Sequence, residues 1–198
     1  MKKLAFLTLL AIAAVISSCG SNQIQELPTS SISGNWEAQL TGGTEGASAL
    51  NFLINFNLFV TNGSPTQNVN VNDFAWINAN PCFPPVPDVS PPAVQLTNNI
   101  NTKQITGSIV WTIGKAPGNV LNLSADPNAT PPTGELIATA PSNNGVVTNG
   151  GVNGMWWLTP GTSFPAGLQA CSAGSATSPL PFVMCQGATS CTTAIGPS

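Results

Sequence analysis

Apolar and polar residues alternate along most of the chain after residue 31, with the period of two that is typical of half-buried β-strands. In residues 32–40 every second position is apolar or Gly, and polar side chains such as Asn35 and Glu37 lie between them. In residues 52–60, Phe, Ile, Leu and Val alternate largely with Asn. The same reasoning places further strands at 69–77, 93–97, 105–113, 120–123, 134–138, 152–158 and 182–185. The pattern predicts an all-β fold.

Turn signals separate these segments, and a proline-rich stretch interrupts them once. Asn62-Gly63 is a dipeptide that tolerates the positive φ of a tight hairpin, and Asn144-Gly145 and Asn149-Gly150 are further turn signals. Residues 81–92 contain six prolines, which lack the N–H that a strand donates. We therefore expect a surface crossing pinned at Cys82, and a polyproline ligand for a partner domain is the alternative.

Four of the expected strands open alike, with a small polar residue, Gly, any residue and a large apolar one. These are Ser33-Gly34-Asn35-Trp36, Thr106-Gly107-Ser108-Ile109, Thr133-Gly134-Glu135-Leu136 and Asn153-Gly154-Met155-Trp156. Glycine on an inward face allows the bend or bulge that a curling sheet needs. Residues 32–198 are therefore predicted to form one antiparallel up-and-down β-barrel of about eight strands, with a β-sandwich as the alternative. Trp36, Trp111 and Trp156 are candidates for its interior.

A first strand that opens with Gly34-x-Trp36 and leads into such a meander resembles the small barrels of lipocalins and avidins. The lipocalin pattern also has a late basic residue over the Trp, and avidin sites use a Tyr. The chain contains neither Arg nor Tyr, so the resemblance implies a fold and no site residues. The domain also resembles uncharacterised exported bacterial lipoproteins that begin Ile-Ser-Gly-Asn-Trp.

The N-terminal stretch has the parts of an export signal: Lys2 and Lys3, an apolar run over residues 4–16, and two serines before Cys19. The run is shorter than the about 20 residues that a membrane-spanning helix needs. Ending Ile-Ser-Ser-Cys, it resembles a bacterial lipoprotein signal, and an ordinary secretory signal is the alternative. The resemblance implies a cleaved signal (1–18), lipidation of Cys19, a flexible tether (19–31) and, with Gly20 next, passage to the outer membrane of a Gram-negative cell.

Charge excludes several partners. After cleavage, two lysines (Lys103 and Lys115) face seven acidic residues, which gives a net charge of −5. Nucleic-acid binding and adhesion to an anionic membrane both need basic clusters, so both are excluded. Membrane lipid, contacted through acylated Cys19, is the expected partner. A small-molecule, glycan or protein ligand remains unidentified.

The other four cysteines are Cys82, Cys171, Cys185 and Cys191. An even number in an exported chain predicts two disulfides, for which three connectivities exist. We favour Cys82–Cys171 with Cys185–Cys191, and crossed pairs are the alternative. A structural zinc site is disfavoured because the chain has no His and no C-x-x-C pair. No metal or cofactor is expected.

Candidate catalytic groups are scarce. Without His, neither a Ser-His-Asp triad nor a Cys-His pair can form. Paired carboxylates can cleave glycosides, but Glu37 and Glu135 fall on the faces opposite Trp36 and Leu136, where solvent is expected. We therefore expect a non-catalytic binding or structural module, and a carboxylate-dependent glycoside hydrolase is the weaker alternative.

Trp156 and Trp157 are adjacent in an expected strand, so their side chains point to opposite faces. Trp157 then shares the outer face with Asn153 and Thr159, where it can stack on a sugar ring or contact a protein partner. Cover by the loop that follows is the alternative. Two functions remain: a barrel that holds a small apolar or sugar ligand, and a structural surface protein. A cavity among Trp36, Trp111 and Trp156 would favour the first.

Overall fold

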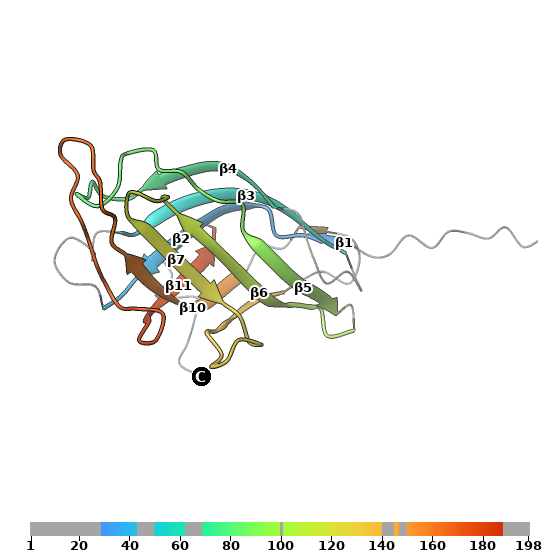
Figure 1. Cartoon of the computed structure of the whole chain (residues 1–198). Helices are drawn as coiled ribbons and strands as arrows, with labels where there is room; N and C mark the ends of the chain where they lie inside the picture. The colour runs from blue at the N-terminus through green and yellow to red at the C-terminus, as the bar shows by residue number, and fades with distance from the viewer. Residues whose placement is uncertain are drawn as a thin grey trace, which may run out of the picture.

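The computed structural model describes residues 29–42, 50–61, 69–99, 101–139, 145–146 and 150–187. These residues form strands and connections and no helix, which confirms the all-β prediction (Figure 1). Accordingly, they include no helical segment of the length and apolarity that crossing a membrane requires. The strands are β1 (Thr29–Ser31), β2 (Gly34–Leu40), β3 (Phe52–Thr61), β4 (Val69–Trp76), β5 (Ala93–Asn99), β6 (Gln104–Ile113), β7 (Val120–Ala125), β8 (Glu135–Thr139), β9 (Gly145–Val146), β10 (Gly150–Thr159) and β11 (Leu180–Gln186).

The strands join in one large sheet with the order β5-β6-β7-β10-β11-β2-β3-β1-β9, while β4 pairs with β3, and β8 pairs with both β10 and β6. All of these pairings are antiparallel except that of β1 with β9. Five of the eleven pairs among the described strands join strands that follow each other along the chain: β2–β3, β3–β4, β5–β6, β6–β7 and β10–β11. The last strand returns to the first part of the chain, because β11 pairs with β2 from Phe182↔Leu40 to Gln186↔Trp36.

Strands β7 and β8 share one position in the sheet. β6 pairs through residues 104–107 with β8 and through residues 109–113 with β7. On the other side, β10 pairs through residues 150–153 with β8 and through residues 155–159 with β7. The two strands are thus parts of one interrupted strand. The connection between them is closed by the Thr133 N–H, which donates to the Asp126 carbonyl oxygen at 3.0 Å.

Three glycines of the repeated opening pattern lie where this interruption occurs. Gly107 and Gly134 have φ of 142° and 126°, which side chains rarely adopt. A Cβ on Gly107 would overlap the carbonyl oxygen of Gln95, and one on Gly154 would overlap the ring of Phe182. At Gly107, Gly134 and Gly154 the pattern therefore marks positions where backbone or a ring lies too close for any side chain, whereas a Cβ on Gly34 would meet no atom nearer than 3.9 Å.

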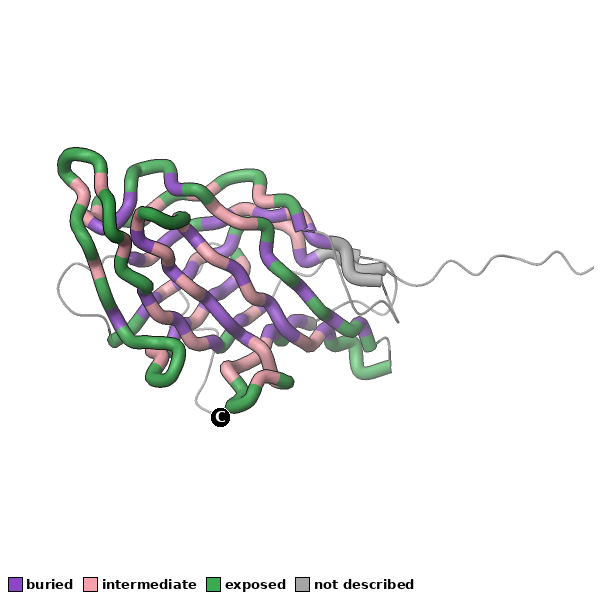
Figure 2. The backbone as a smooth tube through the Cα atoms, in the orientation of Figure 1, coloured by how far each residue is buried: buried purple, intermediate pink, exposed green. Residues whose placement is uncertain are grey.

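The inward side chains form one core beneath the sheet. Buried and less buried residues alternate along the strands, and exposed residues gather at the connections (Figure 2). Trp36, Trp111 and Trp156 are all buried there. The Trp36 ring stacks on Phe56 with centroids 5.3 Å apart, and Trp111 meets Phe182 edge to face at 6.0 Å.

Two short strands differ from the sequence expectation. Residues 29–31, assigned above to the tether, form β1 and pair with Thr61, Val60 and Phe59 of β3. Their sequence, Thr-Ser-Ser, does not alternate between apolar and polar residues. They join the sheet through backbone hydrogen bonds, which the pattern of side chains does not predict. β9, which has only two residues, is also not predicted by that pattern and pairs with β1. The export signal with Cys19, the Asn62-Gly63 turn and Cys191 lie outside the described residues.

Replacing Gly107 by Ala should lower the free energy of unfolding by about 3 kcal/mol, because both the positive φ and the overlap with Gln95 oppose a side chain. Gly167→Ala is the matched control, since Gly167 also has positive φ (89°) but no atom within 4 Å of the added Cβ. It should cost about 1 kcal/mol. Urea unfolding of both variants measures the difference. Equal losses would show that Gly107 is needed only for its backbone conformation.

Candidate functional site

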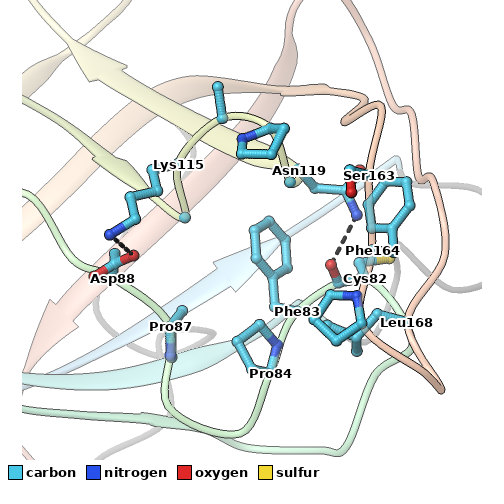
Figure 3. A pocket seen from close by; sticks show the side chains of 15 residues that line it. Cys82, Phe83, Pro84, Pro87, Asp88, Lys115, Asn119, Ser163, Phe164 and Leu168 are labelled. Atoms are coloured by element: carbon cyan, nitrogen blue, oxygen red, sulfur yellow. Dashed lines mark hydrogen bonds and ion pairs between the residues drawn. The ribbon is translucent and has the colours of Figure 1, made fainter.

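Three connections at one end of the sheet enclose a pocket of about 400 Å³ (Figure 3). They are residues 77–92 between β4 and β5, residues 114–119 between β6 and β7, and residues 160–179 between β10 and β11. The lining residues are Cys82, Phe83, Pro84, Pro87, Asp88, Gly114, Lys115, Ala116, Pro117, Gly118, Asn119, Ser163, Phe164, Pro165 and Leu168.

A disulfide joins two of these connections. Cys82 of the proline-rich crossing is bonded to Cys171 of the β10–β11 connection, which confirms the favoured pairing. The two cysteines are 89 residues apart, and closing a loop of that length restricts the unfolded chain by about 4–5 kcal/mol in the chain-entropy model. Cys185 is also held in a disulfide, and its predicted partner Cys191 lies outside the described residues.

The buried side chain of Asn119 links all three connections. Its Nδ2 donates to the carbonyl oxygens of Cys82 and Gln169 at 2.7 and 2.8 Å. Its Oδ1 accepts from the backbone N–H groups of Gly161 and Cys171 at 2.9 and 3.1 Å. A carboxamide has two donors and an acceptor oxygen with two lone pairs, so its hydrogen-bonding capacity is fully used. Asn119 immediately precedes β7, so the sheet holds this residue in place.

The apolar wall of the pocket is centred on Phe83, whose ring is fixed by neighbouring aromatic residues. Phe83 is buried and stacks on Trp76 with centroids 5.1 Å apart. The indole N–H of Trp76 donates to the Pro84 carbonyl oxygen at 3.1 Å. Trp76 also meets Phe74 at 4.9 Å, and Phe74 meets Phe52 of the core at 5.2 Å. A row of rings therefore extends from the core to the pocket wall.

The rest of the wall is also mostly hydrocarbon. Phe164 and Leu168 come from the β10–β11 connection, and the prolines are Pro84, Pro87, Pro117 and Pro165. Figure 3 shows Phe83 near the centre, with Phe164 and Leu168 to one side and Pro84 and Pro87 below. Such a surface favours ligands that are largely apolar.

One ion pair lies at the edge of the pocket. The Nζ of Lys115 is 2.9 Å from an Oδ of Asp88, and the two side chains are 73% and 59% exposed. Among the residues lining the pocket, Asp88 is the one carboxylate and Lys115 the one cation. Glycoside cleavage uses two carboxylates that flank the scissile bond, and this lining provides one.

The residues singled out from the sequence lie elsewhere. None of Trp36, Trp111 and Trp156 lines the pocket, and the indole N–H of Trp156 donates to the Thr41 and Pro181 carbonyl oxygens, both at 3.1 Å. Trp157 is half-buried on the outer face of β10, and Asn153 and Thr159 are exposed there. Thr159 Oγ1 accepts a hydrogen bond from Asn122 at 3.1 Å. A contact role for this outer face stays a prediction.

Sequence reasoning identified Cys82, Cys171 and the proline-rich crossing but missed Phe83, Phe164 and Asn119. A signal for the two rings was present, because each precedes a proline outside any expected strand, as Phe83-Pro84 and Phe164-Pro165. Burial of such a ring against a neighbouring connection is favourable, and Phe83 is buried and Phe164 half-buried. Asn119 carried no comparable signal among the many asparagines of the chain.

Neither metal chemistry nor known proteins assign a role to this pocket. Across the described residues, Cys, Asp and Glu side chains form no group of three that could hold a metal ion. No protein-family model matches the chain, and no curated protein or solved structure is significantly similar to it. The function must therefore be inferred from the geometry.

Replacing Asn119 by Ala should lower the free energy of unfolding by about 3–5 kcal/mol, because four backbone groups, one buried and three part-buried, lose their partner. Asn122→Ala is the control. Its side chain makes longer bonds of 3.1–3.4 Å in a less buried place where water can replace them, so about 1 kcal/mol or less is expected. Urea unfolding compares the two. Similar losses at both positions would mean that Asn119 is not a special link.

Proposed function

We propose that this protein is a lipid-anchored, non-catalytic binding module of the bacterial envelope that holds a small, mostly apolar ligand in the pocket between its three connections. The observation that carries the proposal is the way the pocket is built. A disulfide and a fully bonded buried Asn119 fix its walls through bonds within the protein itself. Preorganised walls reduce the entropic cost of binding. The volume of about 400 Å³ also lies within the range of small-molecule sites, about 300–1,000 Å³.

The finer fold that we propose is an up-and-down barrel with this pocket at its mouth. β1 and β2 share a place beside β3, and β7 and β8 share another, so the sheet has eight positions: β4, β3, β1/β2, β11, β10, β7/β8, β6 and β5. The pairing of β11 with β2 supports closure on that side. The seam would lie between β4 and β5, which the proline-rich crossing connects. A two-sheet sandwich remains the alternative.

β1, the first described strand after the proposed anchor in the sequence, and the pocket lie at opposite ends of the sheet. β1, which follows the tether, pairs with the last residues of β3, Phe59 to Thr61. The crossing that forms the pocket leaves β4 after Trp76, which pairs with the first residue of β3, Phe52. Ten strand residues at about 3.3 Å each separate these ends by roughly 30 Å. A protein tethered through Cys19 would thus present its pocket away from the membrane.

Absence of catalysis is supported by the pocket lining. The one carboxylate is paired with Lys115, and the chain has no His to transfer protons near neutral pH. Glu37 and Glu135, the acids considered from the sequence, do not line the pocket. The charged groups of the pocket, Asp88 and Lys115, can therefore recognise a ligand but are not arranged to cleave a bond in it.

Cys19→Ala should release the protein from membranes, because the acyl chains on Cys19 are the proposed anchor. Fractionation of cells that express both forms checks this, and mass spectrometry of the mature wild-type N-terminus should find acylated cysteine. Cys82→Ala is the control for loss of a cysteine and should stay with the membrane. If Cys19→Ala also stays membrane-bound, the lipoprotein assignment is wrong.

Filling the pocket should abolish ligand binding. Phenylnaphthylamine, a neutral dye that fluoresces in apolar surroundings, is the probe. Ser163→Trp places a ring in the pocket from an exposed position and should weaken dye binding at least about tenfold by steric exclusion. Ala176→Trp adds the same ring to an exposed position of the same connection outside the lining, and should leave binding unchanged.

Thermal unfolding of both tryptophan variants should match the wild type, so that a loss of binding reports the pocket. Equal dye binding by Ser163→Trp and the wild type would place the dye elsewhere and remove support for a pocket ligand. No dye binding at all would favour the structural surface protein instead.

A further inference from the structure

This inference rests on the proposed function and concerns the charge of the ligand. The ion pair at the pocket edge is not needed to hold the pocket wall. The Gly114 N–H donates to the Asp88 carbonyl oxygen at 2.6 Å, and the Ser90 N–H donates to the Thr112 carbonyl oxygen at 3.0 Å. Between them, Val89 forms a β-bridge with Ile113. With the backbone fixed in this way, an exposed ion pair adds little to stability.

The two partners of the ion pair differ in their freedom to move. Asp88 has a short side chain, and backbone residues 88–90 are paired with the last two residues of β6 and with Gly114. Lys115 lies in a turn, and its four-carbon side chain is 73% exposed. Lys115 can therefore turn toward solvent at small cost. The Asp88 carboxylate remains at the pocket edge. An incoming cation can therefore replace Lys115 as its partner, whereas an incoming anion would be repelled by it.

The surrounding charges also favour a cation. The described residues carry the lysines Lys103 and Lys115 against the acids Glu37, Asp73, Asp88, Asp126 and Glu135. The negative excess raises the local concentration of cations and lowers that of anions. The rings of Phe83 and Phe164 line the same pocket, and the face of an aromatic ring attracts a positive charge.

We propose that the pocket selects an amphipathic organic cation: an apolar body that lies against Phe83 and Phe164, and a protonated amine that displaces Lys115 from the carboxylate of Asp88. Lys115 then acts as a built-in competitor that occupies Asp88 when the pocket is empty. No bond is made or broken, and selectivity comes from exchange of one ion pair for another.

Three probes with the same ring test this by isothermal titration calorimetry at neutral pH and low salt: naphthylmethylamine, naphthalenemethanol and naphthoate. They present an ammonium, a hydroxyl and a carboxylate on one apolar body. The wild type should bind the amine at least about tenfold more tightly than the carboxylate, with the alcohol between them. Added sodium chloride should weaken binding of the amine and leave binding of the alcohol unchanged.

Substitutions identify the groups responsible. Asp88→Asn should reduce amine affinity to that of the alcohol, while alcohol affinity is unchanged. Lys115→Gln should raise amine affinity severalfold, because the competitor is removed. Asp73→Asn and Lys103→Gln change the net charge by the same amounts at exposed positions outside the pocket lining, and should leave the order of the probes unchanged.

The outcomes separate this inference from the proposed function. If the alcohol binds and Ser163→Trp blocks it, but the amine has no advantage or Asp88→Asn keeps that advantage, selection of a cation is wrong and the pocket function stands. Tighter binding of naphthoate would also overturn the inference. If none of the three probes binds the wild type, selection of a cation is wrong, and the pocket function also fails if phenylnaphthylamine does not bind.

Discussion

The buried carboxamide of Asn119 is the interaction on which the pocket end of this protein depends. A polar group that is almost fully removed from water must find hydrogen-bond partners, and Asn119, at the end of one connection, finds four in the backbones of the other two. Those connections are rich in Pro and Gly, and only short parts of them pair with a strand, as Val89 does with Ile113. The Asn119 side chain adds four bonds to the backbone hydrogen bonds that join the connections directly, such as the one from the Gln169 N–H to the Pro81 carbonyl oxygen at 2.9 Å. The Cys82–Cys171 disulfide keeps two of the connections covalently joined when the protein unfolds.

Rigidity reaches the pocket from the core through packed rings. Phe52 is fully buried in β3, and contacts through Phe74 and Trp76 connect it to Phe83 at the pocket wall. Glycine makes the opposite contribution, because it lets backbones touch. A Cβ on Gly114 would crowd the ring of Phe83, and one on Gly161 would overlap the backbone of Gly118. Large rings and absent side chains together define the shape of the proposed binding site.

Because the chain has few charged residues, the two at the pocket make a large contribution to the local electrostatic field. Charged residues make up 6% of the chain, so Asp88 and Lys115 have little competition for a charged ligand near the pocket. The outer face of β2, β3 and β4 relies on amides instead, where Asn72 donates to Asn55 at 3.1 Å and Asn55 donates to Asn35 at 2.7 Å. Such neutral side chains keep the surface wet without adding to the electrostatic field that a ligand meets.

The sequence by itself determined the fold class and nine of the strands, because alternation of apolar and polar residues is a local property that a half-buried strand requires. It also favoured the correct Cys82–Cys171 pair and marked Gly107 and Gly154 as positions for a bend or bulge. The structure adds that backbone or a ring lies too close to both glycines for a side chain. Only the tertiary structure decided that β7 and β8 share one sheet position, that polar residues 29–31 join the sheet, and that a pocket exists. The bonds of Asn119 join residues 37 to 52 positions apart, and no local period encodes a contact between connections at that separation.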